Sequence, residues 1–287
     1  PEPRLPRPAD APPAAMPLPF HILDVFTTGA SMTGNQLLVV EDREDTLSDE
    51  SMLAIAKEVN FAETAVVRRA DVRIFTPETE IPQAGHPVLG LAEIVGGSQP
   101  EVTLQTRKGP ITVRRSGSRW IMSQDPAEWL GQASAADVAS FLRTGASDLV
   151  GGSFPIASTC GLGYALVPVA SAEALDALQV EALAPPPGPW PLGPWAVYFY
   201  CRTGEDAIRA RMFCHEGGAW TEDVATGSAA GPLTAHLAPI SARIEQGSSR
   251  RAHLYVSAEA RNGRVDVGGT VLRVATGQWS AIVRSKL

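Results

Sequence analysis

The sequence reads Arg73-Ile74-Phe75, a polar loop and Ala84-Gly85-His86-Pro87, and later repeats this order as Arg211-Met212-Phe213, a loop and Thr226-Gly227-Ser228-Ala229. In both places an apolar strand leads through the loop to a glycine turn that opens a helix, at nearly the same spacing. Repetition of one strand–helix unit predicts a duplicated α/β fold with a cleft between its halves. Short strand–loop–helix units can also resemble each other by chance, so the repeat alone leaves that alternative open.

The elements before and after the first glycine turn follow from hydrophobic periodicity and turn signals. A helix is expected from Ser48, a good N-cap, to Asn60, which ends it. A second helix opens at Gly85, with Pro87 suited to its first position. Strands are expected at residues 20–26, 36–40, 62–67 and 72–75, and around residues 102, 111 and 120.

The second half repeats this order with a proline-rich insert at residues 185–194. A helix is expected from Ser171, with Leu175, Leu178 and Val180 among its apolar positions. A loop then precedes the second glycine turn, which opens a helix at residues 229–237. Strands are expected near residues 155–159, 164–169, 196–201 and 208–213, and around residues 254, 265, 271 and 282.

The composition excludes several classes of partner and site. The chain has 287 residues, 44% of them hydrophobic, and a mean hydropathy of −0.01, which favours a globular protein of about two domains. The net charge of −7 argues against nucleic acid or an anionic membrane as partner, because both attract basic patches. Cys160, Cys201 and Cys214 are odd in number and lack Cys-x-x-Cys spacing, so a reducing, cytoplasmic setting fits best. His215 and Glu216 have no partner for a metal site, and a surface loop is expected there.

The chain divides into a leader and two halves. Residues 1–16 are rich in Pro and Ala and lack the apolar core of a signal peptide, so a disordered leader is expected. Two uncharged runs, at residues 149–172 and 184–201, are interrupted by Gly or Pro and are not expected to span a membrane. The predicted divisions are residues 17–127 for the first half, 128–277 for the second, and 278–287 as a segment that can return to the first.

Each glycine turn lies at the start of an expected helix, where unpaired backbone N–H groups and the helix dipole favour a carboxylate. His86 is at the first turn, whereas Asp223, Thr226 and Ser228 are at the second, and Glu63 lies where a helix gives way to a strand. Taken singly, each has an ordinary structural explanation as a cap or a solvated strand end. If both turns face one cleft, they form two pockets for a small carboxylate-bearing substrate.

Four ordered motifs carry a more specific signal. They are Asn60-Phe61-Ala62-Glu63-Thr64, Arg73-Ile74-Phe75-Thr76-Pro77-Glu78 with Glu80 and Pro82, Ala84-Gly85-His86-Pro87, and Glu222-Asp223-Val224-Ala225-Thr226-Gly227-Ser228-Ala229. Together with Asp24-Val25-Phe26-Thr27, Gly34-Asn35 and Gln246-Gly247, they closely resemble the PhzF family of phenazine-biosynthesis isomerases. The resemblance extends over nearly the whole chain from about residue 20.

The resemblance implies a diaminopimelate-epimerase-like α/β (α+β) fold of two pseudo-symmetric halves, each a curved, mostly antiparallel sheet wrapped around a central helix. It also implies a cytoplasmic, homodimeric isomerase of secondary metabolism, such as antibiotic biosynthesis, that uses no cofactor and no metal. In the family's phenazine enzyme a glutamate moves a proton between carbons of a dihydro-hydroxyanthranilate. On this pattern the catalytic residues are Glu63, His86 and Asp223, and the substrate-binding residues are Gln83, Gly85, Thr226, Gly227 and Ser228.

Departures from the family pattern flank the expected site. Gln83 stands where the family has an aromatic residue, and residues 248–251 replace a Gly-Arg-Pro-Ser segment. The expected substrate is therefore a small unsaturated carboxylic (amino) acid that need not be the phenazine precursor, and an alkylproline-type pyrroline is another candidate. Further departures are Ala62 for Ser, Val88 for Thr and Val224 for Pro.

Rival enzyme classes fit the motifs less well. Two-cysteine epimerases of the same fold carry thiols at both helix turns, where this chain has Ala84 and Thr226. Gly161-Leu162-Gly163 lacks the third glycine of a dinucleotide site, and Gly227-Ser228-Ala229-Ala230-Gly231 has the wrong spacing for a serine hydrolase. The alternatives that stay open are a catalytically silent small-molecule binding protein and an epimerase of the same fold.

Overall fold

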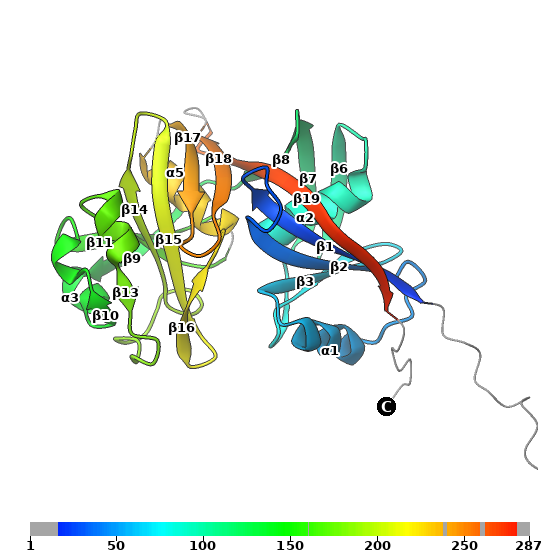
Figure 1. Cartoon of the computed structure of the whole chain (residues 1–287), viewed down its shortest axis with the longest axis horizontal. Helices are drawn as coiled ribbons and strands as arrows, with labels where there is room; N and C mark the ends of the chain where they lie inside the picture. The colour runs from blue at the N-terminus through cyan, green and yellow to red at the C-terminus, as the bar shows by residue number, and fades with distance from the viewer. Residues whose placement is uncertain (1–16, 160, 238–239, 259–261, 280–287) are drawn as a thin grey trace, which may run out of the picture.

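The computed structural model describes residues 17–159, 161–237, 240–258 and 262–279. The leader expected at residues 1–16, Cys160 and residues 280–287 lie outside the described residues. In each half of the described chain, strands wrap around one helix, α2 (Gly85–Gly96) in the first and α5 (Gly227–Leu237) in the second (Figure 1).

The first half forms largely as the sequence predicts. Ser48 caps α1 (Asp49–Val59) by accepting a hydrogen bond from the Ser51 N–H (3.2 Å), and Asn60 ends this helix in the left-handed conformation (φ 54°). The prediction for Pro87 was wrong by two positions: α2 begins at Gly85, so Pro87 is its third residue, where a missing N–H still removes no intrahelical bond. The other elements are β1 (Leu18–Thr27), β2 (Asn35–Glu41), α1 (Asp49–Val59), β3 (Glu63–Val67), β4 (Val72–Phe75), β5 (Glu80–Ile81), β6 (Glu101–Thr106), β7 (Gly109–Ser116) and β8 (Arg119–Gln124).

The second half differs from its prediction in several places, one being that residues 265 and 271, expected in separate strands, lie in one long strand. The helix after Ser171 ends at Ala177, and Val180 lies instead in a short strand that pairs with Leu142. The segment expected as a loop before Gly227 contains a strand, which turns back at Gly217 and Gly218 to pair with the strand before it. The elements are β9 (Glu128–Ser134), α3 (Ala135–Ala139), β10 (Leu142–Thr144), η2 (Ala146–Asp148), β11 (Ser153–Ser158), β12 (Tyr164–Pro168), α4 (Ala172–Ala177), β13 (Gln179–Val180), β14 (Ala196–Arg202), β15 (Ala207–Glu216), β16 (Ala219–Asp223), β17 (Ser241–Gln246), β18 (Ala252–Ala258) and β19 (Val265–Trp279).

The repeat seen in the sequence is a repeat of topology. In the first half β2 and β3 are parallel and flank α1, and an antiparallel series β3–β4–β5 leads to α2. In the second half β12 and β14 are parallel and flank α4, and the antiparallel series β14–β15–β16 leads to α5. Chance similarity does not account for this shared order, so the sequence repeat reflects two halves built on one plan.

Both central helices are buried on most of their surface. The first turns of α2 and α5 carry no acidic residue, and most residues of each helix are buried. The side chains of both helices belong to one apolar core, so this core continues across the two halves. Because the helices are held on all sides, their N-terminal residues are fixed in position.

The long strand β19 joins the two halves. It pairs with β18 of the second half and also with β8 and β1 of the first, where Leu18 lies opposite Trp279. The end of the described chain therefore lies against its beginning, as Figure 1 shows. None of the helices in the described residues combines the length and apolar character needed to cross a bilayer.

Candidate active site

The N-termini of α2 and α5 meet between the two halves. A Cβ atom added to Gly85 would lie 3.4 Å from both the Gly227 Cα and the Ser228 backbone nitrogen, so the two turns are in van der Waals contact. Ala84 is the N-cap of α2 and provides no side-chain hydrogen bond. The two glycine turns predicted from the sequence are thus adjacent, with unpaired helix N–H groups beside each other.

Glu63 and His86 are in contact on the first-half side of this junction. Glu63 begins β3 and His86 is the second residue of α2; their side chains are 18% and 4% exposed, and the Glu63 Oε2 lies 3.2 Å from the His86 Nδ1. Burial raises the pKa of Glu63 to about 8 and lowers the pKa of His86 to about 4. At neutral pH the pair is therefore mainly a carboxylic acid beside a neutral imidazole, which is an arrangement suited to proton transfer.

Asp223 reaches the same cluster from the end of β16. Its carboxylate accepts hydrogen bonds from the Asn35 Nδ2 (2.7 Å) and the Thr226 Oγ1 (2.6 Å). Burial and the nearby Glu63 raise the pKa of Asp223 to about 6, and His86 and the hydrogen bonds from Thr226 and Asn35 oppose this rise. The structure thus brings together all three residues predicted to be catalytic, two from the first half and one from the second.

A buried glutamine holds the second turn in place. The Gln246 Nε2 donates to the Asp223 carbonyl oxygen and to the Thr226 Oγ1, both at 2.9 Å, and the Gln246 Oε1 accepts from the Tyr198 hydroxyl (2.9 Å). The Thr226 backbone N–H also donates to this oxygen (3.2 Å). Thr226, expected to bind substrate, therefore has its hydroxyl occupied by Asp223 and Gln246.

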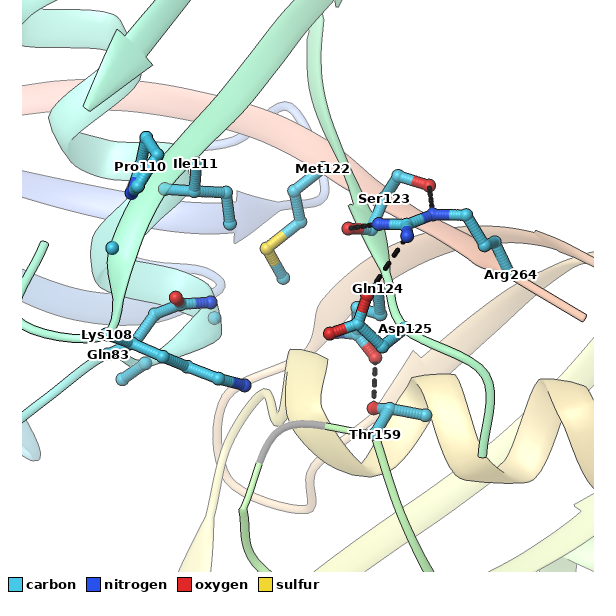
Figure 2. Close-up of a pocket in the computed structure, with 13 residues that line it drawn as sticks. Gln83, Lys108, Pro110, Ile111, Met122, Ser123, Gln124, Asp125, Thr159 and Arg264 are labelled. Atoms are coloured by element: carbon cyan, nitrogen blue, oxygen red, sulfur yellow. Dashed lines mark hydrogen bonds and ion pairs between the residues drawn. The ribbon is translucent and has the colours of Figure 1, made fainter. Parts of the chain in front are cut away.

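The remaining predicted residues lie around the junction. Ser228 shares a 2.6 Å hydrogen bond with the Tyr164 hydroxyl. Gly227 packs against Phe26, since an added Cβ would lie 3.2 Å from its ring. Gln83 and Gly85 line a cavity between the halves, which Figure 2 shows together with the end of β8.

One acidic residue that influences the site was missed. Glu216 was expected on a surface loop, but it ends β15, and its charge adds to the rise in the pKa of Glu63. The turn after it approaches the first half, where a Cβ on Gly217 would lie 3.1 Å from the Glu78 Oε1. Gly217-Gly218 between two strand-like runs is a hairpin signal, and it could have placed Glu216 at the end of a paired strand.

Comparison with known proteins supports this assignment of motifs. The PhzC-PhzF family, described as phenazine biosynthesis-like protein, matches residues 23–277. The trans-2,3-dihydro-3-hydroxyanthranilate isomerase of Pseudomonas aeruginosa is 34% identical over 90% of this chain and 98% of its own length. The enzyme of the same name from Pseudomonas chlororaphis is 36% identical over 76% of this chain and 79% of its own length.

Solved structures share the architecture. A predicted epimerase from Pseudomonas aeruginosa is 31% identical with a TM-score of 0.73, over 92% of this chain and 99% of that one. A PhzF-family protein from Bacillus anthracis is 21% identical with a TM-score of 0.74 over 92% and 99%. A hydroxyproline epimerase from Agrobacterium vitis has a TM-score of 0.56 at 12% identity, over 92% and 91%. The fold is therefore the two-half, diaminopimelate-epimerase-like α/β fold that the sequence resemblance implies.

Proposed function

Because the chain belongs to the PhzC-PhzF family of phenazine biosynthesis-like proteins, we propose that it is an isomerase that moves a proton, and with it a double bond, within a small unsaturated carboxylic acid. Glu63 is the acid–base group of this reaction. Two relatives that share most of their length with this chain are named as isomerases of trans-2,3-dihydro-3-hydroxyanthranilate, an unsaturated amino acid of this class.

The observation that carries the proposal is the buried contact between Glu63 and His86. A carboxyl group with a pKa of about 8 holds a proton at neutral pH. It can give this proton to one carbon of the substrate, and the carboxylate so formed can take a proton from a second carbon. The double bond moves, Glu63 returns to its starting state, and the substrate is neither oxidised nor reduced.

The other groups of the site position the substrate. Asp223, with a pKa of about 6, is mainly ionised at neutral pH and can accept a hydrogen bond from a substrate hydroxyl or ammonium group. The substrate carboxylate lies at the adjoining helix N-termini of Gly85 and Gly227, where backbone N–H groups and the helix dipoles favour an anion. The acid–base group and the anion site come from opposite sides of one junction.

The proposal is tested with trans-2,3-dihydro-3-hydroxyanthranilate and with pyrroline carboxylic acids as probes in deuterated water. The wild-type protein is expected to isomerise at least one probe and to incorporate solvent deuterium. Glu63→Gln should lose roughly 10²- to 10⁴-fold in rate, because it removes the proton carrier, and should still bind the probe. Glu58→Gln, an exposed change on α1, serves as the control. Full activity of Glu63→Gln would refute the role of Glu63, and binding without any exchange by the wild type would favour a binding protein.

A further inference from the structure

A cavity of about 210 Å³ lies beside the helix junction, and neither Glu63, His86 nor Asp223 lines it. Its walls come from the start of α2, the β6–β7 turn and the end of β8, and the second half adds Thr159 and Arg264 (Figure 2). Pockets for drug-sized ligands measure roughly 300–1,000 Å³. This cavity therefore suits a small metabolite or one substituent of it.

Most polar groups of the cavity already have partners. Arg264 pairs with the Asp125 carboxylate at 3.0 Å, so these two charges compensate each other. The Gln124 side chain donates to the Gly227 carbonyl (2.9 Å) and accepts from the Thr159 hydroxyl (2.6 Å). These contacts form a fixed wall with little remaining capacity to bind a ligand.

Two side chains on the opposite wall are different. The Lys108 ammonium group and the Gln83 amide make no hydrogen bond or ion pair within the part of the chain that the structure describes, and only the Lys108 backbone N–H is bonded nearby. Figure 2 shows both side chains extending from this wall into the cavity. Lys108 is exposed and Gln83 is half-buried, so the mouth of the cavity carries one positive charge without an ion-pair partner next to a free hydrogen-bonding amide.

We propose that this cavity is the specificity pocket of the site, and that Lys108 pairs there with the substrate carboxylate at the Gly85 turn, which also lines the cavity, while Gln83 hydrogen-bonds to the same carboxylate. A carboxylate matches both: it neutralises the ammonium group and accepts from the amide. A cationic ligand would be repelled by Lys108. A wholly apolar ligand would leave the half-buried Gln83 amide without a partner.

The pocket adjoins the proposed reaction site at the Gly85 turn. Gln83 and Gly85 in its wall precede His86, which contacts Glu63, and Gln124 is bonded to the first residue of α5. Met122 lines the cavity beside both glycine turns, since its Cε would lie 3.0 Å from a Cβ on Gly85 and 3.4 Å from one on Gly227. The inference rests on the proposed function in that the bound molecule is taken to be the substrate, and it places the non-reacting end of that molecule here.

The test compares anthranilate with aniline, which has the same ring and amino group but no carboxylate, by titration calorimetry. Wild-type protein is expected to bind anthranilate more tightly. Lys108→Met should weaken anthranilate binding about tenfold, as expected for loss of a hydrogen bond to a charged group, and should not change aniline binding. Lys108→Arg should restore most of the preference. Lys57→Met, the same change on the exposed face of α1, should have no effect.

The outcomes separate this pocket from the proposed reaction. The pocket assignment would be refuted if the wild type bound anthranilate and aniline equally, or if a folded Lys108→Met protein kept the preference for anthranilate. Thermal unfolding identifies a variant that fails to fold, and Gln83→Leu then provides the second test, with a smaller loss expected for anthranilate alone. If the Lys108 preference is present while Glu63→Gln keeps full turnover, the pocket stands and the proposed function fails.

Discussion

The two halves of the molecule share the same strand and helix order, but they carry different polar side chains at the helix junction. In the first half, buried Arg73 on β4 holds Glu80 of β5 with two hydrogen bonds and reaches Asp49 of α1 (3.0 Å). In the second half, buried Arg211 on β15 holds Glu222 of β16 with two bonds of 2.9 Å. Each arginine also lies over the phenylalanine two positions later. The repeated Arg-x-Phe of the sequence is therefore a repeated clamp that fixes the strand pair leading to each helix.

The positions that follow the clamps have diverged. Counting from the clamped glutamate in each half, Ile81 corresponds to Asp223 and His86 corresponds to Ser228. Glu63 begins β3, which pairs with β4, the strand that carries Arg73. The matching strand of the second half is β14, which pairs with β15, and it begins with the buried Ala196. The duplicated fold thus supplies two equivalent frames, and the asymmetric placement of carboxyl and imidazole groups within them creates one site.

The largest expected effect comes from breaking the clamp of the second half. Arg211→Met should lower the free energy of unfolding by about 3–5 kcal/mol, because it leaves Glu222 without its buried partner. It also removes the bonds from Arg211 to the carbonyls of Leu175 (3.0 Å) and Leu178 (2.7 Å). Arg73→Met should lower the free energy of unfolding by less, since the third partner of Arg73, Asp49, is mostly exposed. Urea unfolding of both variants measures this difference, and equal losses of unfolding free energy would contradict the prediction.

The next effect tests the asymmetry of the site itself. Asp223→Asn keeps the size of the side chain but removes the charge that the Asn35 and Thr226 donors surround. We expect a loss of about 100-fold in kcat/KM, together with loss of the acidic limb of the pH profile near pH 6, where Asp223 ionises. Asp206→Asn, an exposed change in the same half, is the control. An unchanged acidic limb would assign it to another group.

Local signals in the sequence allowed the duplicated plan to be predicted, and the family resemblance carried by the four motifs allowed the cluster of Glu63, His86 and Asp223 to be predicted. Glycine turns, N-caps and the four ordered motifs are read within a few residues of each other. Ser48, Asn60 and Gly85 accordingly begin or end their helices where expected. Glu63 and His86 were predicted to act together, and they are in contact.

Groups that act only through long-range pairing could not be predicted. Gln246 is far from Asp223 in the sequence, and only the pairing of β17 with β15 and β18 brings its amide to the second turn. Lys108 likewise reaches the cavity because a hairpin turn places it opposite the end of β8. A single sequence gives no register for such strands, so these residues look like ordinary strand and turn positions.

A smaller effect concerns the stability cost of keeping Glu63 buried. Its pKa is about 8 in the folded protein and 4.5 ordinarily, so the folded state binds the proton more tightly. Stability should therefore fall as the pH rises from about 4.5 to 8. Glu63→Gln removes this dependence and should be more stable than the wild type at pH 8, with the difference vanishing near pH 4. Thermal unfolding across this range measures it, and Glu58→Gln should show no such trend.

The smallest expected effect is the influence of Glu216, in the second half, on the pKa of Glu63, in the first half. The negative charge of Glu216 raises the pKa of Glu63, so Glu216→Gln should lower that pKa and move the alkaline limb of the kcat/KM profile from about pH 8 to lower pH. Burial is the larger cause of the raised pKa of Glu63, so the limb should shift without disappearing. Glu205→Gln, an exposed change in the turn before β15, should leave the limb in place. A limb unmoved by Glu216→Gln would mean that burial in the first half alone sets the proton affinity of Glu63, and that the second half contributes the anion site and Asp223 but no tuning of the acid.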